Sequence, residues 1–154
     1  MIWPRMRPAF RPAFKPLPFA CAALFVLLAA CASKPLAPPV NLIVAPQEPV
    51  MPVAPVRAPG APPSIVRIWF STLTLQPGTW FDGTIVASTN VASVEVRTAA
   101  FSVNTNHDAP GIFRFHTRVL EVPPLSRLRS YELYIIARNT VGDRDVERAR
   151  LSVR

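Results

Sequence analysis

Hydrophobic and polar residues alternate along much of the C-terminal part of the chain, from residue 64 to residue 154. One run places Phe113, Phe115, Thr117 and Val119 against Arg114, His116 and Arg118, and another places Ala149, Leu151 and Val153 against Arg148, Arg150 and Arg154. This period of two is typical of strands with one buried face. No window of the segment shows a convincing helical stripe. The pattern predicts an all-β fold, a single β-sandwich of about seven short strands.

Turn-forming residues separate the predicted strands at 76–78, 89–90, 104–111, 122–124 and 139–143. The run Tyr131–Asn139, followed by Gly142, resembles the Y-x-L-x-V-x-A-x-N-x-x-G penultimate strand of fibronectin type III and bacterial immunoglobulin-like domains. Residues 81–87 and 91–96 are similar to the second and third strands of such domains. The resemblance implies an immunoglobulin-like sandwich over residues 64–154, and it concerns the fold rather than a function.

Four residues of the penultimate strand and its turn are expected to have structural roles. Tyr131 stands where a tyrosine corner would bond its hydroxyl to the backbone of the crossing loop. Ala137 falls on the same side of the strand and is small where the two sheets approach. Asn139 and Gly142 bracket a turn that needs residues tolerant of positive φ.

The first 30 residues predict an export signal. Residues 1–16 contain no acid and four basic residues, Arg5, Arg7, Arg11 and Lys15. Residues 17–30 carry no charge, and a helix of that length spans about 21 Å, short of a bilayer core of roughly 30 Å. A basic start followed by a short apolar run is typical of a signal peptide rather than of a permanent membrane span.

The apolar run ends in Leu28-Ala29-Ala30-Cys31, which resembles the lipobox of bacterial lipoproteins. The resemblance implies cleavage before Cys31 and lipid on its thiol, so that the lipid anchors the protein in a membrane. The next residue is Ala32 rather than aspartate, which in such lipoproteins favours the outer membrane; we expect the domain to face the periplasm. The alternatives are an ordinary secretory signal cut at Ala30-Cys31-Ala32, and lipidation of Cys21, which almost no apolar run precedes.

Residues 31–63 begin with Cys31 and predict an extended spacer. Ten of the 19 prolines lie between residues 35 and 63, and each proline disfavours helix at its own and the preceding position. We expect a disordered, proline-rich linker that holds the folded domain clear of the lipid. The alternatives are a ligand for a partner groove, through PxxP spacing at 46–49 and 52–55, and pairing of residues 41–44 with an edge strand.

Positive charge is a further feature, with a formal net charge of +8 on the chain. If the last two strands pair with the third, one outer face gathers the candidate interaction residues Tyr134, Ile136, Arg97, Arg138, Arg148 and Arg150. An apolar centre with an arginine rim is typical of a protein-binding surface. Cross-strand ion pairing on a soluble face is the alternative. Nucleic acid is not an expected partner of an exported, lipid-anchored protein.

The segment offers little for catalysis. Its two histidines are His107, in a polar loop beside Asp108, and His116, which lies between two arginines on the face predicted to meet solvent. A metal site needs convergent ligands, and neither His107-Asp108 nor the acidic run 143–147, whose carboxylates suit calcium, is specific. No paired carboxylates, catalytic triad or phosphate loop stands out. We expect no enzyme activity, no metal and no cofactor.

The leading hypothesis is a lipid-anchored protein of the bacterial outer membrane with three parts. Residues 1–30 are the signal peptide, residues 31–63 the lipidated cysteine and spacer, and residues 64–154 a module that binds another envelope component, a protein, without catalysis. The first alternative is a glycan- or peptidoglycan-binding module in which Trp69 or Trp80 stacks on sugars. The second is a metal-dependent module or enzyme that uses His107 and the nearby acids.

Overall fold

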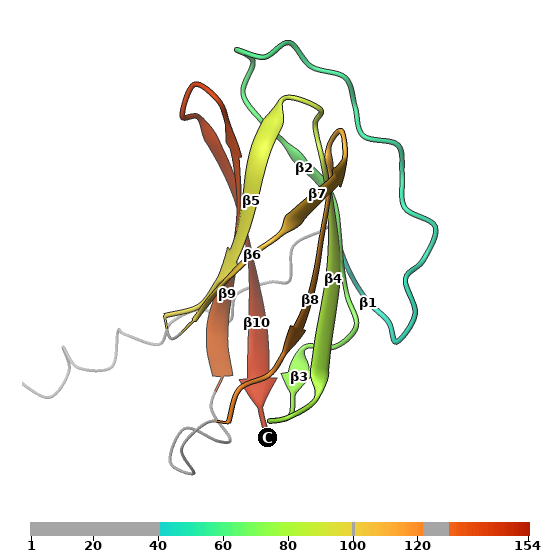
Figure 1. Cartoon of the computed structure of the whole chain (residues 1–154), viewed down its shortest axis with the longest axis vertical. Coiled ribbons are helices and arrows are strands. Elements are labelled where there is room, and N and C mark those ends of the chain that lie inside the picture. The colour runs from blue at the N-terminus through green and yellow to red at the C-terminus, as the bar shows by residue number, and fades with distance from the viewer. Residues whose placement is uncertain (1–40, 100, 122–129) are drawn as a thin grey trace, which may run out of the picture. The chain divides into compact units, whose positions relative to one another are not determined.

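The computed structural model describes residues 41–99, 101–121 and 130–154 (Figure 1). They form ten strands: β1 (Leu42–Val44), β2 (Ile65–Phe70), β3 (Thr74–Leu75), β4 (Trp80–Ala87), β5 (Val91–Arg97), β6 (Ser102–Asn104), β7 (Asn106–Ala109), β8 (Ile112–Arg118), β9 (Ser130–Asn139) and β10 (Arg144–Val153). The predicted all-β fold is confirmed for these residues. No described segment is a helix long and apolar enough to cross a membrane. The predicted signal peptide and Cys31 lie outside the described residues.

The strands form two five-stranded sheets (Figure 1). The first, which we call the β4 sheet, has the order β1-β2-β4-β8-β7, and the second, the β9 sheet, has the order β3-β10-β9-β5-β6. Neighbouring strands are antiparallel except for the pairs β1–β2 and β3–β10, which are parallel. Strand β9 pairs with β10 on one side and with β5, the predicted third strand at residues 91–96, on the other. The condition on which the candidate interaction face depends is therefore met.

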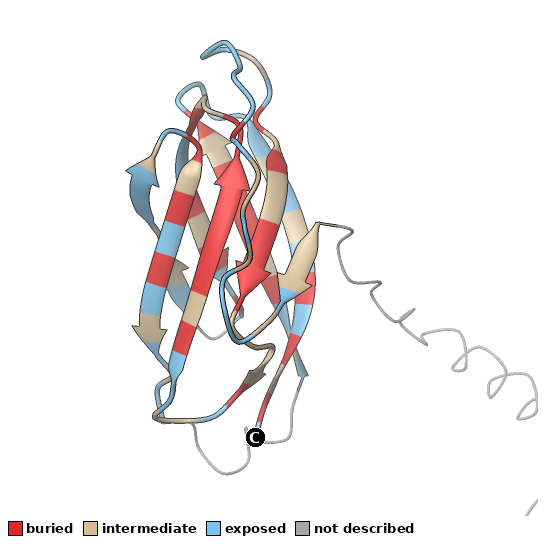
Figure 2. Ribbon diagram, turned by 90° about the vertical axis from the view of Figure 1, so that its right-hand side faces the viewer, coloured by how far each residue is buried: buried red, intermediate tan, exposed pale blue. Residues whose placement is uncertain are grey.

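The inward sides of both sheets contribute to one hydrophobic cluster. On β8 the buried residues Phe113 and Phe115 alternate with exposed Arg114 and His116, as the sequence predicts. Figure 2 shows this alternation as bands of red and pale blue along the strand. The same alternation on β10 buries Ala149, Leu151 and Val153. Burial of apolar side chains from both sheets is the main force that holds the two sheets together.

The strands outnumber the seven expected, partly because a predicted turn contains strands. The prediction of a turn over residues 104–111 is wrong for most of that range. Ser102–Asn104 pairs with β5, and Asn106–Ala109 pairs with β8 before the chain turns at Gly111. The chain therefore passes from one sheet to the other at Thr105 and gives each sheet a short polar edge strand. Short edges of this kind expose little unpaired backbone.

Residues 45–63, which we call the strap, lie against the β4 sheet and pass in front of it in Figure 2. Ala54 is buried, the carbonyl of Pro55 accepts a hydrogen bond from the backbone of Thr89 at 3.0 Å, and the carbonyl of Ala61 accepts one from Asn139 at 3.1 Å. The expectation of a free spacer that ends at residue 63 is therefore corrected, because this part of it is held by hydrogen bonds to the folded domain.

The segment just before the strap, β1, pairs with a strand of the β4 sheet. This pairing is one of the alternatives that the sequence leaves open for residues 41–44. Strand β1 runs parallel to β2, and its central residue Ile43 lies opposite Trp69. The carbonyl of Asn41 accepts a hydrogen bond from the backbone of Ile68 at 2.9 Å. The domain therefore includes residues from Asn41 onward, and the predicted boundary at residue 64 is about twenty residues too late.

The turn after β9 has the geometry that its residues require. Gly142 has a φ of +97°, in the region that glycine adopts without strain. The side-chain oxygen of Asn139 accepts hydrogen bonds from the backbone of Val141 at 3.2 Å and of Asp143 at 2.8 Å. Ala137 is fully buried. Tyr131 packs against the core, and the predicted hydroxyl bond of a tyrosine corner stays a prediction.

Candidate functional site

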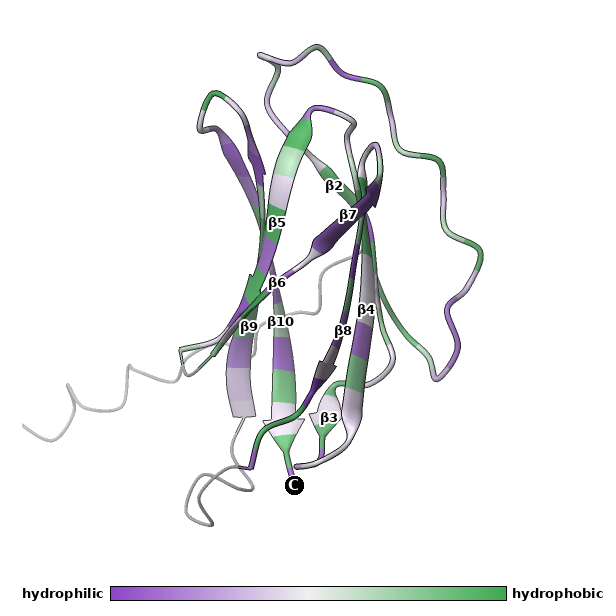
Figure 3. Ribbon diagram, in the orientation of Figure 1, coloured by the Kyte–Doolittle hydropathy of each residue, from purple (hydrophilic) through white to green (hydrophobic). Residues whose placement is uncertain are grey.

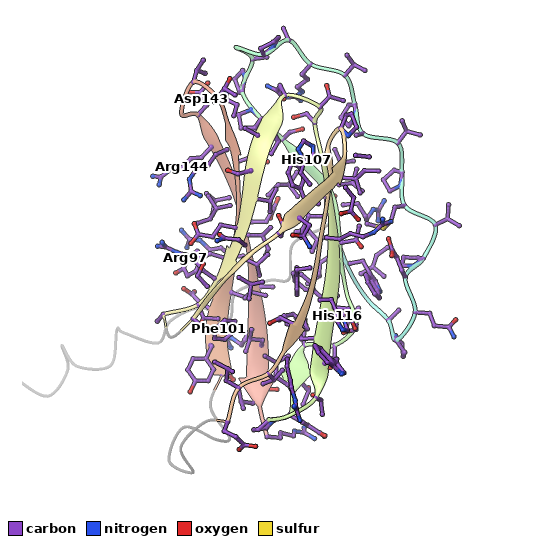
Figure 4. The ribbon with its side chains drawn as sticks, in the orientation of Figure 1. Arg97, Phe101, His107, His116, Asp143 and Arg144 are labelled. Carbon is purple, nitrogen blue, oxygen red and sulfur yellow. The ribbon has the colours of Figure 1, made fainter. Side chains whose placement is uncertain are left out.

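The outer surface of the β9 sheet carries five arginines, which we call the arginine face: Arg97, Arg138, Arg144, Arg148 and Arg150. The strand register brings them together. Tyr134 lies between Arg148 on β10 and Arg97 on β5, and Arg138 lies opposite Arg144. Figure 4 shows Arg97 and Arg144 pointing away from the core, on the opposite side of the domain from His116. Figure 3 shows both strands in the hydrophilic colour where they approach the turn between β9 and β10.

Glu95 neutralises one part of the arginine face. Its carboxylate accepts hydrogen bonds from the Ser102 hydroxyl at 2.9 Å and from the Arg138 guanidinium at 3.0 Å, and it lies 4.0 Å from Nη1 of Arg97. These contacts lower the pKa of Glu95, the hydrogen bond from Ser102 having the largest effect. Arg138 is therefore held in an ion pair with Glu95 on the neighbouring strand. For this residue the alternative prediction, cross-strand ion pairing, applies.

Tyr134 lies in the middle of the arginine face. Its hydroxyl donates to the Glu132 carboxylate, and this hydrogen bond raises the pKa of the phenol. The guanidinium carbon of Arg148 lies 5.3 Å from the centroid of the Tyr134 ring, within the range of a cation–π contact. Among the residues that the structure describes, no carboxylate pairs with Arg144, Arg148 or Arg150. Within the described ranges, these three guanidinium groups are therefore not neutralised by a carboxylate.

Ile136, the expected apolar centre of this surface, is the one predicted interaction residue that a partner cannot reach. It lies in the same register as the arginines, but only 5% of its surface is exposed. Its cross-strand neighbours are Val146 on β10 and Glu95 on β5, whose side chains flank it. The prediction of an exposed apolar centre is therefore corrected, and the accessible aromatic group is Tyr134.

The outer surface of the β4 sheet contains a hollow of about 290 Å³. Its main lining residues, by which we define the hollow, are Glu48, Trp69, Asp82, Thr84, Asp108, Arg114 and His116. Arg114 donates to Asp108 at 3.1 Å and to Glu48 at 3.3 Å, and these bonds raise the pKa of Arg114, the bond to Asp108 most. Because Glu48 belongs to the strap, this pair of bonds ties the strap to strand β8 across the sheet.

The two tryptophans considered as sugar-binding residues differ in exposure. Trp69 is only 6% exposed, and its indole N–H donates to the carbonyl of Ala45 at 3.0 Å. Trp80 is 56% exposed and stacks on His116, with ring centroids 4.1 Å apart. His116 is also bonded through Nδ1 to the Asp82 carboxylate. The exposed aromatic ring beside the hollow is therefore that of Trp80.

The residues considered as metal ligands have separate structural partners. His107 stacks on Phe113 with centroids 4.5 Å apart, and Asp108 belongs to the hollow. In the acidic run, Asp145 accepts a hydrogen bond from the backbone of Ile65 at 2.7 Å. Within residues 41–99, 101–121 and 130–154, no three His, Cys, Asp or Glu side chains come together in a way that could hold a metal ion.

The sequence reasoning missed three residues of these surfaces. Arg144 is in phase with Arg148 along β10, so the alternation contains enough information to place it on the arginine face. Thr84 lies on a strand whose two sides are both buried, and no local pattern marks its hydroxyl. Glu48 lies in a proline-rich segment, 66 residues from Arg114 in sequence, and nothing near it indicates the contact.

Comparison with known proteins adds no assignment. No protein-family model matches the chain, and no curated protein matches it significantly. The two surfaces are therefore interpreted from their own geometry. The arginine face offers unpaired cationic groups around one tyrosine, and the hollow offers a mixed set of carboxylates, an arginine and a hydroxyl.

Proposed function

We propose that the chain is a lipoprotein of the bacterial outer membrane whose immunoglobulin-like domain binds an acidic protein partner in the periplasm through the arginine face. Cys31 carries the lipid, and the proline-rich residues that follow connect it to the domain. The role is binding rather than catalysis. The observation that carries the proposal is the group of three arginines, Arg144, Arg148 and Arg150, with no carboxylate partner among the described residues.

The order of the strands supports the immunoglobulin-like part of the proposal. In immunoglobulin-like domains, strands A, B, E and D form one sheet, and strands C, F and G form the other. Taking β2, β4, β8 and β7 as A, B, E and D, and β5, β9 and β10 as C, F and G, reproduces both sheets. The run Tyr131–Asn139 then occupies strand F, where its sequence pattern belongs.

The balance of charge on the arginine face supports an acidic partner. Five arginines share this surface with two carboxylates, those of Glu95 and Glu132, which leaves a surplus of three positive charges. Glu95 is engaged by Arg138 and Ser102, and Glu132 by Tyr134. Arginine binds carboxylates in a bidentate manner, and because its guanidinium is planar and preorganised it loses less side-chain entropy per hydrogen bond than lysine does. A surface with exposed aspartate and glutamate fits this arrangement.

The anchor is tested by expressing the full chain in bacteria with Cys31→Ser. We expect the parent protein to incorporate labelled fatty acid and to sediment with outer membranes, and the Cys31→Ser variant to lose both properties, because the thiol is the site of acylation. Acyl chains contribute about 0.8 kcal/mol per buried methylene, so losing them releases the protein. Cys21→Ser is the matched control and should behave as the parent. Fatty-acid labelling of the Cys31→Ser variant would refute the anchor.

The arginine face is tested with poly-L-glutamate as a model of an acidic protein surface. For the purified full-length chain, we expect the double variant Arg148→Gln/Arg150→Gln to bind at least about tenfold more weakly than the parent, equivalent to 1.4 kcal/mol. Arg57→Gln/Arg67→Gln removes the same charge from residues outside the face and is the control. Equal weakening by both double variants would mean that only net charge matters and would contradict the proposal.

A further inference from the structure

The hollow on the β4 sheet is separate from the arginine face. It lies on the outer surface of the other sheet and is lined by residues of β2, β4, β7, β8 and the strap. With a volume of about 290 Å³, it falls just below the range for small-molecule sites, roughly 300–1,000 Å³. The hollow therefore suits a ligand of about the size of one sugar ring.

Thr84 shows that the hollow has an unused polar group at its base. Only 1% of its surface is exposed, and its strand register places it between Trp69 on β2 and Arg114 on β8. Its hydroxyl has no hydrogen-bond partner among the described residues. Buried hydroxyl groups are normally paired, so an unpaired one that lines a hollow is available as a hydrogen-bond partner for a ligand.

The charged groups of the hollow restrict what that ligand can be. Three carboxylates, those of Glu48, Asp82 and Asp108, face a single arginine, so an anion would be repelled. Arg114 is held by two of these acids, and the third is bonded to His116. The described residues provide no metal-binding cluster. A neutral ligand that both donates and accepts hydrogen bonds fits this set.

Sugar hydroxyl groups have this dual capacity. They can donate to the carboxylates of Asp82 and Asp108 and accept from the Arg114 guanidinium or the Thr84 hydroxyl. The exposed ring of Trp80, stacked on His116 at the rim, offers an apolar surface to the C–H face of a sugar. We propose that the hollow binds one sugar residue of a glycan, with Thr84 and Asp108 as hydrogen-bonding residues and Trp80 as the stacking residue.

The test measures binding of N-acetylglucosamine oligosaccharides and of purified peptidoglycan sacculi to the full-length chain. Thr84→Val keeps the shape of the side chain and removes the hydroxyl, and Asp108→Asn keeps the size and removes the charge. We expect each to weaken oligosaccharide binding by about tenfold. The matched control is Thr140→Val, which removes an exposed hydroxyl in the turn between β9 and β10 and should bind as the parent does.

Thermal unfolding of the same variants separates loss of the site from loss of the fold. Because the Thr84 hydroxyl is unpaired, Thr84→Val should leave Tm unchanged or raise it. The proposal is overturned if neither the oligosaccharides nor sacculi bind at about 10 mM sugar, if both site variants bind as the parent does, or if the amine glucosamine binds and the neutral sugars do not. Since the arginine face lies on the other sheet, its assay with poly-L-glutamate is independent of these outcomes.

Discussion

Gly111→Ala is expected to lower the free energy of unfolding by about 4 kcal/mol. Gly111 has a φ of +74°, a conformation that costs about 1–2 kcal/mol for a residue with a side chain. An added Cβ would also lie 2.4 Å from the carbonyl oxygen of Ala87 and 2.6 Å from Cβ of Ala54. The Ala87 neighbour is backbone, which cannot rotate away, and Gly111 itself accepts a hydrogen bond from the Ala87 amide at 2.8 Å.

Two other glycines serve as controls for Gly111→Ala. Gly142 has a φ of +97° with no atom within 4 Å of an added Cβ, so Gly142→Ala measures the cost of φ alone, about 1 kcal/mol. Gly60 has neither a positive φ nor a close neighbour, so Gly60→Ala should change stability little. Urea unfolding followed by tryptophan fluorescence gives the three values. If Gly111→Ala lowers the free energy of unfolding no more than Gly142→Ala does, then the close contacts at Gly111 do not contribute to the loss of stability.

The same substitution tests how the strap is held. Ala54 is a buried residue of the strap, and its Cβ is one of the atoms that an alanine at position 111 would displace. Pushing it outward strains two nearby hydrogen bonds between the strap and Thr89. The Thr89 amide donates to the Pro55 carbonyl, and the Arg57 amide donates to the Thr89 hydroxyl. We therefore expect faster proteolytic cleavage within the strap of the folded Gly111→Ala variant, and no such change in Gly142→Ala.

The strands that carry a clear alternation could be predicted from the sequence. In β8 and β10 the apolar residues fall at every second position, so one register alone buries them, and the structure buries those residues. The pairing of β9 with β5 and β10 could be predicted as well, because the resemblance to immunoglobulin-like domains implies this order of strands. The arginine face is a consequence of the same alternation, since Arg148 and Arg150 lie out of phase with Ala149 and Leu151.

The strap and the hollow could not be predicted, because their contacts are distant in sequence and involve backbone groups. Proline content indicates an extended chain but not whether that chain lies on a surface. The strap is fixed by carbonyls such as those of Ala45 and Ala61, which every residue has. Ile136 shows that a clear alternation can also mislead. Its position in the alternation of β9 predicts an exposed side chain, yet its cross-strand neighbours cover it.

Gly83→Ala is expected to lower the free energy of unfolding by about 3 kcal/mol, for a reason unrelated to φ. Gly83 lies on the inward side of β4, beneath three aromatic rings of the core, those of Phe70, Phe81 and Phe115, whose centroids lie 5.1 to 5.9 Å apart. An added Cβ would lie 2.4 Å from the ring of Phe115 and 2.7 Å from that of Phe70. Close-packed rings inside a core have no space to move into, so the cost is that of overpacking.

A second substitution shows whether this overpacking is the cause. Phe115→Leu removes most of the atoms that the new methyl group would meet, so Gly83→Ala combined with Phe115→Leu should cost less than the sum of the two single changes by about 1 kcal/mol or more. Urea unfolding of the four proteins gives this coupling, and near-ultraviolet circular dichroism reports the aromatic packing. A steric conflict with Phe115 disappears when that ring is removed, whereas strain in the backbone of β4 does not. If the two changes in the free energy of unfolding are strictly additive, the cost of Gly83→Ala lies in the backbone of β4 rather than in the aromatic cluster.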